Sequence, residues 1–102
     1  MNPVFHSKAS WEKRRLIFDP APAMAVGDEL ESIFSYSIYD ENGNSQADMF
    51  DSVPTIIDDK VIIVLKGGTP KATYSLILRL KTVDGDWIED DLKILIRETP
   101  AV

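Results

Sequence analysis

The sequence contains no cysteine, which excludes a disulfide framework and thiolate chemistry. Histidine is almost as scarce, because His6 is the only one in 102 residues. Catalysis or metal binding by imidazole groups is therefore not expected. The longest apolar run, Val61 to Leu65, is far shorter than the roughly twenty residues of a membrane-spanning helix. These absences predict a non-enzymatic protein that needs no cofactor and no metal.

Basic residues are also in the minority. The 11 Lys and Arg residues against 17 Asp and Glu give a net charge of −6, which is unfavourable for a nucleic-acid surface. Residues 1–15 carry no apolar stretch, so the sequence predicts neither a secretory signal nor a membrane anchor, and the protein is expected to be cytoplasmic on synthesis. No nucleic-acid or membrane partner is expected.

The composition, 44% hydrophobic and 27% charged, is that of a globular domain, and the length suits one domain. Residues 1–13 are expected to form a polar N-terminal arm, because they fit neither helical nor strand periodicity. Residues 14–102 are then expected to form a single domain.

Alternating apolar residues predict several strands in this domain. Residues 15–18 read as a short edge strand that ends at a proline, and residues 60–65 read as a central strand that is apolar on both faces. In the segment that ends at Tyr39, we expect Phe34, Tyr36 and Ile38 to share one buried face. Residues 45–51 give only a weak strand signal.

Turn residues separate these segments. Asn42-Gly43 predicts a type I′ turn, and Gly67-Gly68-Thr69-Pro70 predicts a tight turn and not a phosphate-binding loop, because no helix follows it. Asp40 to Asp51 is a near miss to a calcium-binding loop, and a plain turn is the favoured interpretation. The remaining acidic clusters could pair as general acid and base, but are better explained as solvated turns and edges.

The last two strands predict a hairpin whose register can be derived. A two-residue loop at Asp84-Gly85 would place buried positions opposite charged ones, which excludes it. A three-residue loop that begins at Val83, with Gly85 left-handed, pairs apolar with apolar residues and charges with complementary partners. The expected pairs are Tyr74 with Ile94, Leu76 with Leu92, Arg79 with Glu89, Leu80 with Ile88 and Lys81 with Trp87. Asp90 falls at a position whose side chain would point into the core. A carboxylate there requires either a bulge near residues 89–91 or an opening of the sandwich to solvent.

No segment repeats apolar residues at helical spacing. About seven short strands separated by Gly, Pro and Asp turns therefore predict an all-β fold. The expected architecture is an immunoglobulin- or fibronectin-III-like antiparallel β-sandwich without a disulfide.

The basic and aromatic residues near the N-terminus suggest a surface for a protein partner, although Trp11 could instead cap the end of the sandwich. A truncation that removes residues 1–12 is expected to weaken assembly and leave the fold intact. The predicted partner-binding residues are Phe5, Trp11, Arg14, Arg15 and Trp87. A stand-alone carbohydrate-binding module, with Trp87, Tyr36 or Tyr39 as a stacking platform, is the alternative.

Two motifs carry a family resemblance. Gly27-Asp28-Glu29-Leu30-Glu31-Ser32 is similar to a GDxIxxS opening, and the segment from Leu65 to Tyr74 is similar to an L-S-GG-T-x-G-x-x-Y motif. The strand after Asp84-Gly85 also fits. From about Gly27 onward, the chain thus resembles small phage and prophage proteins encoded among tail genes. Upstream, Asp19-Pro20 is present, but residues 22–26 replace the tryptophan-rich tract of that family.

The resemblance implies a non-enzymatic, immunoglobulin-like structural or adaptor component of a phage tail. Its expected partners are other tail components or further copies of the chain. Its expected location is the virion once it is assembled. The resemblance carries over no catalytic residue.

Overall fold

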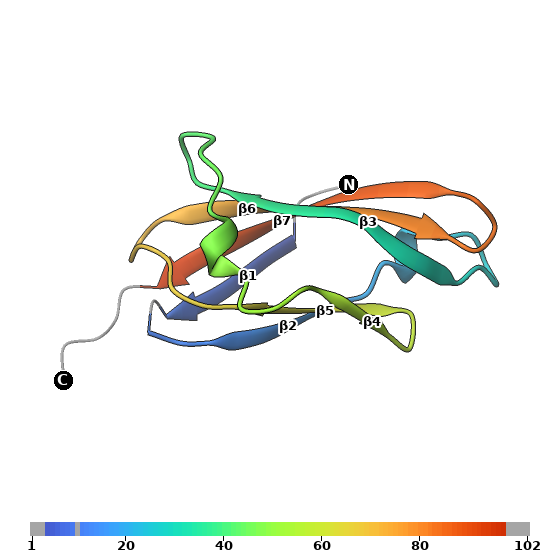
Figure 1. Ribbon diagram of the computed structural model, residues 1–102, viewed down its shortest axis with the longest axis horizontal. Helices are drawn as coiled ribbons and strands as arrows, with labels where there is room; N and C mark the ends of the chain where they lie inside the picture. The colour runs from blue at the N-terminus through green and yellow to red at the C-terminus, as the bar shows by residue number, and fades with distance from the viewer. Residues whose placement is uncertain (1–3, 10, 98–102) are drawn as a thin grey trace.

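Alternating buried and exposed side chains organise the chain into two packed β-sheets. The computed structural model describes residues 4–9 and 11–97 (Figure 1). The strands are β1 (Val4–Ala9), β2 (Arg14–Phe18), β3 (Leu30–Tyr39), β4 (Thr55–Ile57), β5 (Lys60–Leu65), β6 (Thr73–Thr82) and β7 (Trp87–Arg97). Two 3₁₀ turns, η1 (Ala21–Ala23) and η2 (Ala47–Met49), lie in the connections. The described residues contain no α-helix.

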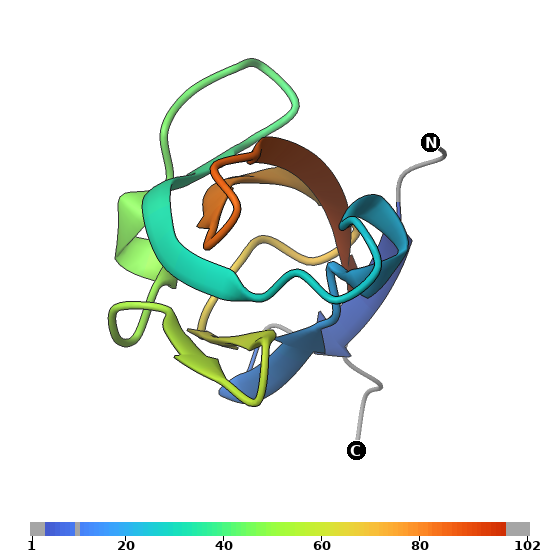
Figure 2. The same cartoon turned by 90° about the vertical axis from the view of Figure 1, so that its right-hand side faces the viewer.

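One sheet has the strand order β1-β7-β6-β3 and the other has β2-β5-β4. All pairs are antiparallel except β1 with β7, which is parallel. The order β2-β5-β4 opposite β3-β6-β7 corresponds to the two sheets of an immunoglobulin-like sandwich, with the first strand placed beside the last. The predicted all-β sandwich is confirmed. In the end-on view, the two sheets curve around a shared interior (Figure 2).

Aliphatic side chains from both sheets fill this interior. Val61, Ile63 and Leu65 of β5 have no exposed surface, which confirms β5 as a central strand, and β2 is an edge strand as predicted. The facing residues of β6 and β7 are equally buried: Tyr74, Leu76, Leu78, Leu80, Leu92, Ile94 and Ile96. Burial of these side chains supplies the main driving force for folding in a domain without a disulfide.

The prediction that residues 1–13 lack regular structure is wrong for β1. Residues 4–9 pair with β7 over the register Val4–Leu92 to Ala9–Arg97. The side chain of Lys8 follows the inward parity of this strand and has no exposed surface. A truncation to residue 12 would therefore remove a strand and a buried side chain, so we no longer expect it to leave the fold intact.

The predicted hairpin register is confirmed at every pair that was specified. Tyr74, Leu76 and Leu80 lie opposite Ile94, Leu92 and Ile88, while Arg79 and Lys81 lie opposite Glu89 and Trp87. Gly85 has a φ of +95°, as the three-residue loop requires. The ladder between β6 and β7 continues without a bulge through Asp90, which is inward and buried.

Strand β3 departs from the predicted alternation. Ile33 pairs with Leu80 and Ser35 pairs with Arg79, so Phe34 is the extra residue of a bulge. The expectation that Phe34 shares a buried face with Ile38 is wrong, because the bulge turns Phe34 outward and leaves it 60% exposed. A second irregularity lies between Leu30 and Ser32.

Two local predictions are corrected between β3 and β5. Residues 47–49 form the 3₁₀ turn η2 instead of a strand, although Phe50 makes an isolated bridge to Leu65. In the turn after β3, Gly43 has a positive φ and Asn42 does not, so the turn is not type I′. The short strand β4 follows Pro54, which the sequence had marked only as an interruption.

Candidate docking surface

The outer face of the four-stranded sheet carries a cluster of two rings and a cation, which we call the aromatic cluster: Phe34 of β3, Lys81 of β6 and Trp87 of β7. The rings of Phe34 and Trp87 are stacked, with centroids 6.2 Å apart and an interplanar angle of 12°. The Lys81 ammonium lies 4.9 Å from the Phe34 centroid and 5.1 Å from the Trp87 centroid. Trp87 is nonetheless 77% exposed, so the cluster forms part of the surface.

Two shallow hollows lie side by side at this cluster. The first has a volume of about 260 Å³ and is lined mainly by the aromatic cluster; Leu80 and Ile88 also line it, although their side chains face the core. The second, of about 470 Å³, has hydroxyl-bearing residues in its lining, with Ser35, Ser37 and Tyr39 at outward positions of β3. Arg79 and Glu89 line both hollows. The face therefore offers an apolar compartment next to a polar one.

Ion pairs hold the other charged side chains of this face in place. Arg79 donates to Glu89 across the strands at 2.8 Å. Lys93 donates to the Ser75 hydroxyl at 2.6 Å and pairs with Asp91 at 3.2 Å. Such exposed pairs add little stability, but they fix where charge is presented on a rigid sheet.

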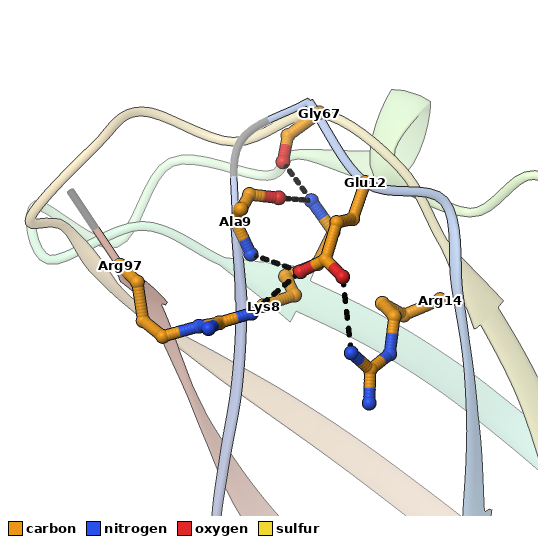
Figure 3. Close-up of polar contacts among 6 residues, drawn as sticks. All are labelled: Lys8, Ala9, Glu12, Arg14, Gly67 and Arg97. Atoms are coloured by element: carbon orange, nitrogen blue, oxygen red, sulfur yellow. Dashed lines mark hydrogen bonds and ion pairs between the residues drawn. The ribbon is translucent and has the colours of Figure 1, made fainter. Parts of the chain in front are cut away.

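Two basic residues near the N-terminus, Lys8 and Arg14, form polar contacts within the protein (Figure 3). The Lys8 ammonium donates to the carbonyl oxygens of Ala9 at 2.7 Å and Gly67 at 2.5 Å. The Glu12 carboxylate accepts hydrogen bonds from the Ala9 amide at 2.6 Å, Arg14 at 3.0 Å and Arg97 at 2.6 Å. These contacts fasten the end of β1 to β7 and to the loop after β5.

The surroundings of Lys8 and Glu12 shift the pKa values of both side chains. Burial lowers the pKa of Lys8 below its ordinary 10.5, and the nearby Glu12 charge opposes this effect. The Ala9 amide and then the Arg14 guanidinium lower the pKa of Glu12 from 4.5 to about 2. Both groups therefore act as structural elements of the N-terminal clamp, defined here as Lys8, Glu12, Arg14 and Arg97.

The predicted partner-binding residues fall into two separate places. Trp11 is 89% exposed beyond the end of β1, and Arg14 and Arg15 begin β2 nearby. Trp87 is the first residue of β7, whereas Arg97 of the clamp is the last. Ten residues of extended strand, about 33 Å, separate these ends. Phe5 pairs with Lys93 in the ladder.

Other polar motifs serve the fold. The Asp40 carboxylate accepts hydrogen bonds from the Asn42 and Asn44 amides at 2.9 Å each and from Gln46 at 3.2 Å, which is the arrangement of a plain turn. These bonds, that of the Asn44 amide first, lower the pKa of Asp40. Within residues 4–9 and 11–97, no group of three or more potential ligands could hold a metal ion.

The motifs behind the family resemblance also have structural roles. Asp28 accepts hydrogen bonds from the amides of Glu29 at 2.8 Å and Asp84 at 3.1 Å, which ties the start of β3 to the β6–β7 loop. The buried Tyr74 hydroxyl accepts the Thr69 amide at 2.9 Å and so closes the glycine-rich turn. Both motifs thus shape loops of the sandwich.

No protein-family model matches the chain, and no curated protein is significantly similar to it. In the part of the chain that the structure describes, no helix is long and apolar enough to cross a membrane.

Of the residues in the aromatic cluster, only Trp87 is among the predicted site residues. Phe34 was assigned to the core, and Lys81 was only paired with Trp87 in the register. The sequence pattern does not show where the bulge lies. If the alternation continued unbroken from Ile33, Phe34 would point outward, but Tyr36 and Ile38 would point outward as well. The bulge lets Phe34 point outward while the other two residues stay on the core side.

Proposed function

We propose that the protein is a non-enzymatic adaptor that acts through protein–protein contacts, with the outer face of β3, β6 and β7 as its docking surface. The observation that carries this proposal is the aromatic cluster. Exposed Trp and Phe side chains on rigid strands are residue types that are enriched at protein interfaces, and Trp is among those that dominate the binding energy there. Exposed rings beside an apolar hollow are also costly to leave solvated, which favours an occupant.

The proposed partners are other components of a phage or prophage tail, or further copies of the chain, and the protein would enter the virion with them. This part of the proposal is supported by the motifs at residues 27–32 and 65–74. Those motifs position loops, as Asp28 and Tyr74 do, so they support the architecture more directly than the identity of a partner.

A carbohydrate-binding module is the second candidate, because two nearly parallel rings could stack against a sugar. Lys81 argues against it, since its ammonium already lies over both rings. Tyr36 packs edge-on against Phe50, with centroids 4.9 Å apart, so it does not extend a flat platform with Trp87. We therefore favour a protein partner.

Site-specific photo-cross-linking tests the adaptor function. Trp87 is replaced by p-benzoylphenylalanine in cells that express the gene naturally, and adducts are identified by mass spectrometry. Val26, which is fully exposed in the loop before β3, is replaced in the same way as a control. Adducts at position 87 with tail proteins or with the chain itself are expected. Specific binding on a glycan array, a strict monomer by light scattering and no protein adduct at position 87 would refute the adaptor.

A further inference from the structure

Charge is divided unevenly over the surface. The outward side chains of β6 and β7 include four cations, Arg79, Lys81, Lys93 and Arg97, and two carboxylates, Glu89 and Asp91. Arg97 pairs with Glu12 at the far end of β7 from Trp87, so three of the four cations have a carboxylate partner and the positive charge left on the outward side of β6 and β7 is 4 − 3 = +1, that of Lys81. The unneutralised charge beside the aromatic cluster is therefore positive, which favours an acidic group of a partner over a basic one at this position.

Lys81 is the cation of this face with the least neutralised charge. Arg79, Lys93 and Arg97 each have a carboxylate partner, at 2.8, 3.2 and 2.6 Å respectively. Among the residues described, Lys81 has the rings of Phe34 and Trp87 as neighbours and no carboxylate. An incoming carboxylate could pair with Lys81 without displacing an internal ion pair, and the rings would shield that pair from water.

The hollows match an extended segment in shape. They meet at Arg79 and Glu89 and together run along the sheet from Trp87 and Phe34 to Tyr39. From Phe34 to Tyr39 the strand rises about 17 Å, which is the length of about five residues of extended chain. Alternate side chains of such a segment point the same way, so an apolar side chain can enter the first hollow while its neighbours stay at the charged rim.

We propose that this surface binds an extended acidic segment of a partner protein, with a carboxylate at Lys81 and an apolar side chain in the hollow beside Phe34 and Trp87. The inference rests on the proposed adaptor function and specifies the chemistry of its partner. Charge complementarity at Lys81 provides selectivity, and contact with Trp87 and Phe34 provides most of the binding energy.

Peptide binding to a single-tryptophan variant tests this inference. The chain has two Trp residues, so Trp11→Phe leaves Trp87 as the only tryptophan reporter of the docking surface. The probes are three capped octapeptides in which Leu alternates with Glu, with Gln or with Lys, and Trp87 fluorescence is titrated at 50 and 500 mM salt. We expect the Glu peptide to bind at least tenfold more tightly than the Lys peptide. Its affinity should fall at least fivefold at high salt.

Charge reversals provide the matched controls. Lys81→Glu is expected to weaken binding of the Glu peptide at least tenfold, whereas Lys60→Glu, which makes the same charge change on β5 of the other sheet, should change it less than twofold. Thermal unfolding verifies that each variant is folded, and Lys81→Gln removes the charge with a smaller perturbation if Lys81→Glu unfolds.

Equal affinity for the three peptides, or equal effects of the two charge reversals, would overturn the acidic partner. Self-association that buries Trp87 and is unaffected by Lys81→Glu would also overturn it, in favour of a second copy. If cross-linking at position 87 still yields tail-protein adducts, only the acidic specificity fails and the docking surface stands. If neither peptides nor adducts are found, the adaptor function fails as well.

Discussion

Phe34 and Trp87 lie on strands that are not neighbours, yet their rings stack at 6.2 Å above β6, the strand between them. Lys81, on that middle strand, lies within about 5 Å of both ring centroids. The contact exists because a bulge in β3 turns Phe34 away from the core. An irregularity in one strand thus creates the most distinctive feature of the surface.

Removing Phe34 tests the role of the bulge. Without it, Ile33, Ser35 and Tyr36 alternate regularly, so the core-facing residues stay in register with β6. The deletion should remain folded and lose only the ring pair, about 0.5–1.5 kcal/mol of unfolding free energy. Deletion of Ser37 is the comparison. It shifts Ile38 out of register and should cost substantially more in denaturant melts. Equal costs would contradict the bulge.

The neighbouring glycines Gly67 and Gly68 should respond differently to substitution by alanine. Both have positive φ values, +70° and +98°, which cost about 1–2 kcal/mol in a residue with a Cβ. At Gly68 the added Cβ would also lie 2.8 Å from Ile96, whereas at Gly67 nothing lies within 4 Å. Gly68→Ala should therefore lower the free energy of unfolding by about 2–4 kcal/mol and Gly67→Ala by about 1–2 kcal/mol.

Glu12→Gln should loosen the N-terminal clamp in a pH-dependent way. The pKa of Glu12 is lowered to about 2, so its carboxylate stabilises the fold above its ordinary pKa of 4.5, and this contribution disappears as the pH falls through 2. The variant should melt at a lower temperature than the parent at pH 7, and the two melting temperatures should converge near pH 2. Faster hydrogen exchange at the β1 amides is expected at neutral pH. A pH-independent difference would contradict the role of the charge.

Asp90→Asn should stabilise the protein. Asp90 is buried opposite Leu78, its Oδ2 atom has no hydrogen-bond partner among the described residues, and burial raises its pKa above 3.8. Folding therefore favours the protonated form. The free-energy cost of having the buried carboxylate ionised is absent below about pH 3.8. This cost grows as the pH rises through the raised pKa. At pH 7 we expect a gain of about 1 kcal/mol, fading in acid.

Asp91→Asn is the control for Asp90. Asp91 points outward and pairs with Lys93 at 3.2 Å, so its loss should change stability by less than about 0.5 kcal/mol. Similar effects of the two substitutions at pH 7 would show that burial of Asp90 has no energetic consequence.

Local patterns predicted much of the fold. The register of β6 with β7 followed from parity and from one glycine, because a hairpin is closed by residues that are near in sequence. The β1 strand was missed because its partner, β7, lies some ninety residues away and pairs in parallel. The site was only partly predicted, since Trp87 was identified and its neighbours Phe34 and Lys81 were not.

The sequence by itself determined the all-β class, the central β5 strand and the last hairpin, because period-two alternation and turn chemistry act over short distances. Only the tertiary structure decided which way Phe34 points, because the bulge depends on pairing with β6. It likewise decided that Lys8 is buried against the carbonyl oxygen of Gly67, a contact across 59 residues. Contacts between distant segments therefore place Lys8 and Arg14 in a clamp instead of a free basic arm. The bulge opposite β6 likewise places Phe34, which the sequence pattern assigns to the core, on the surface.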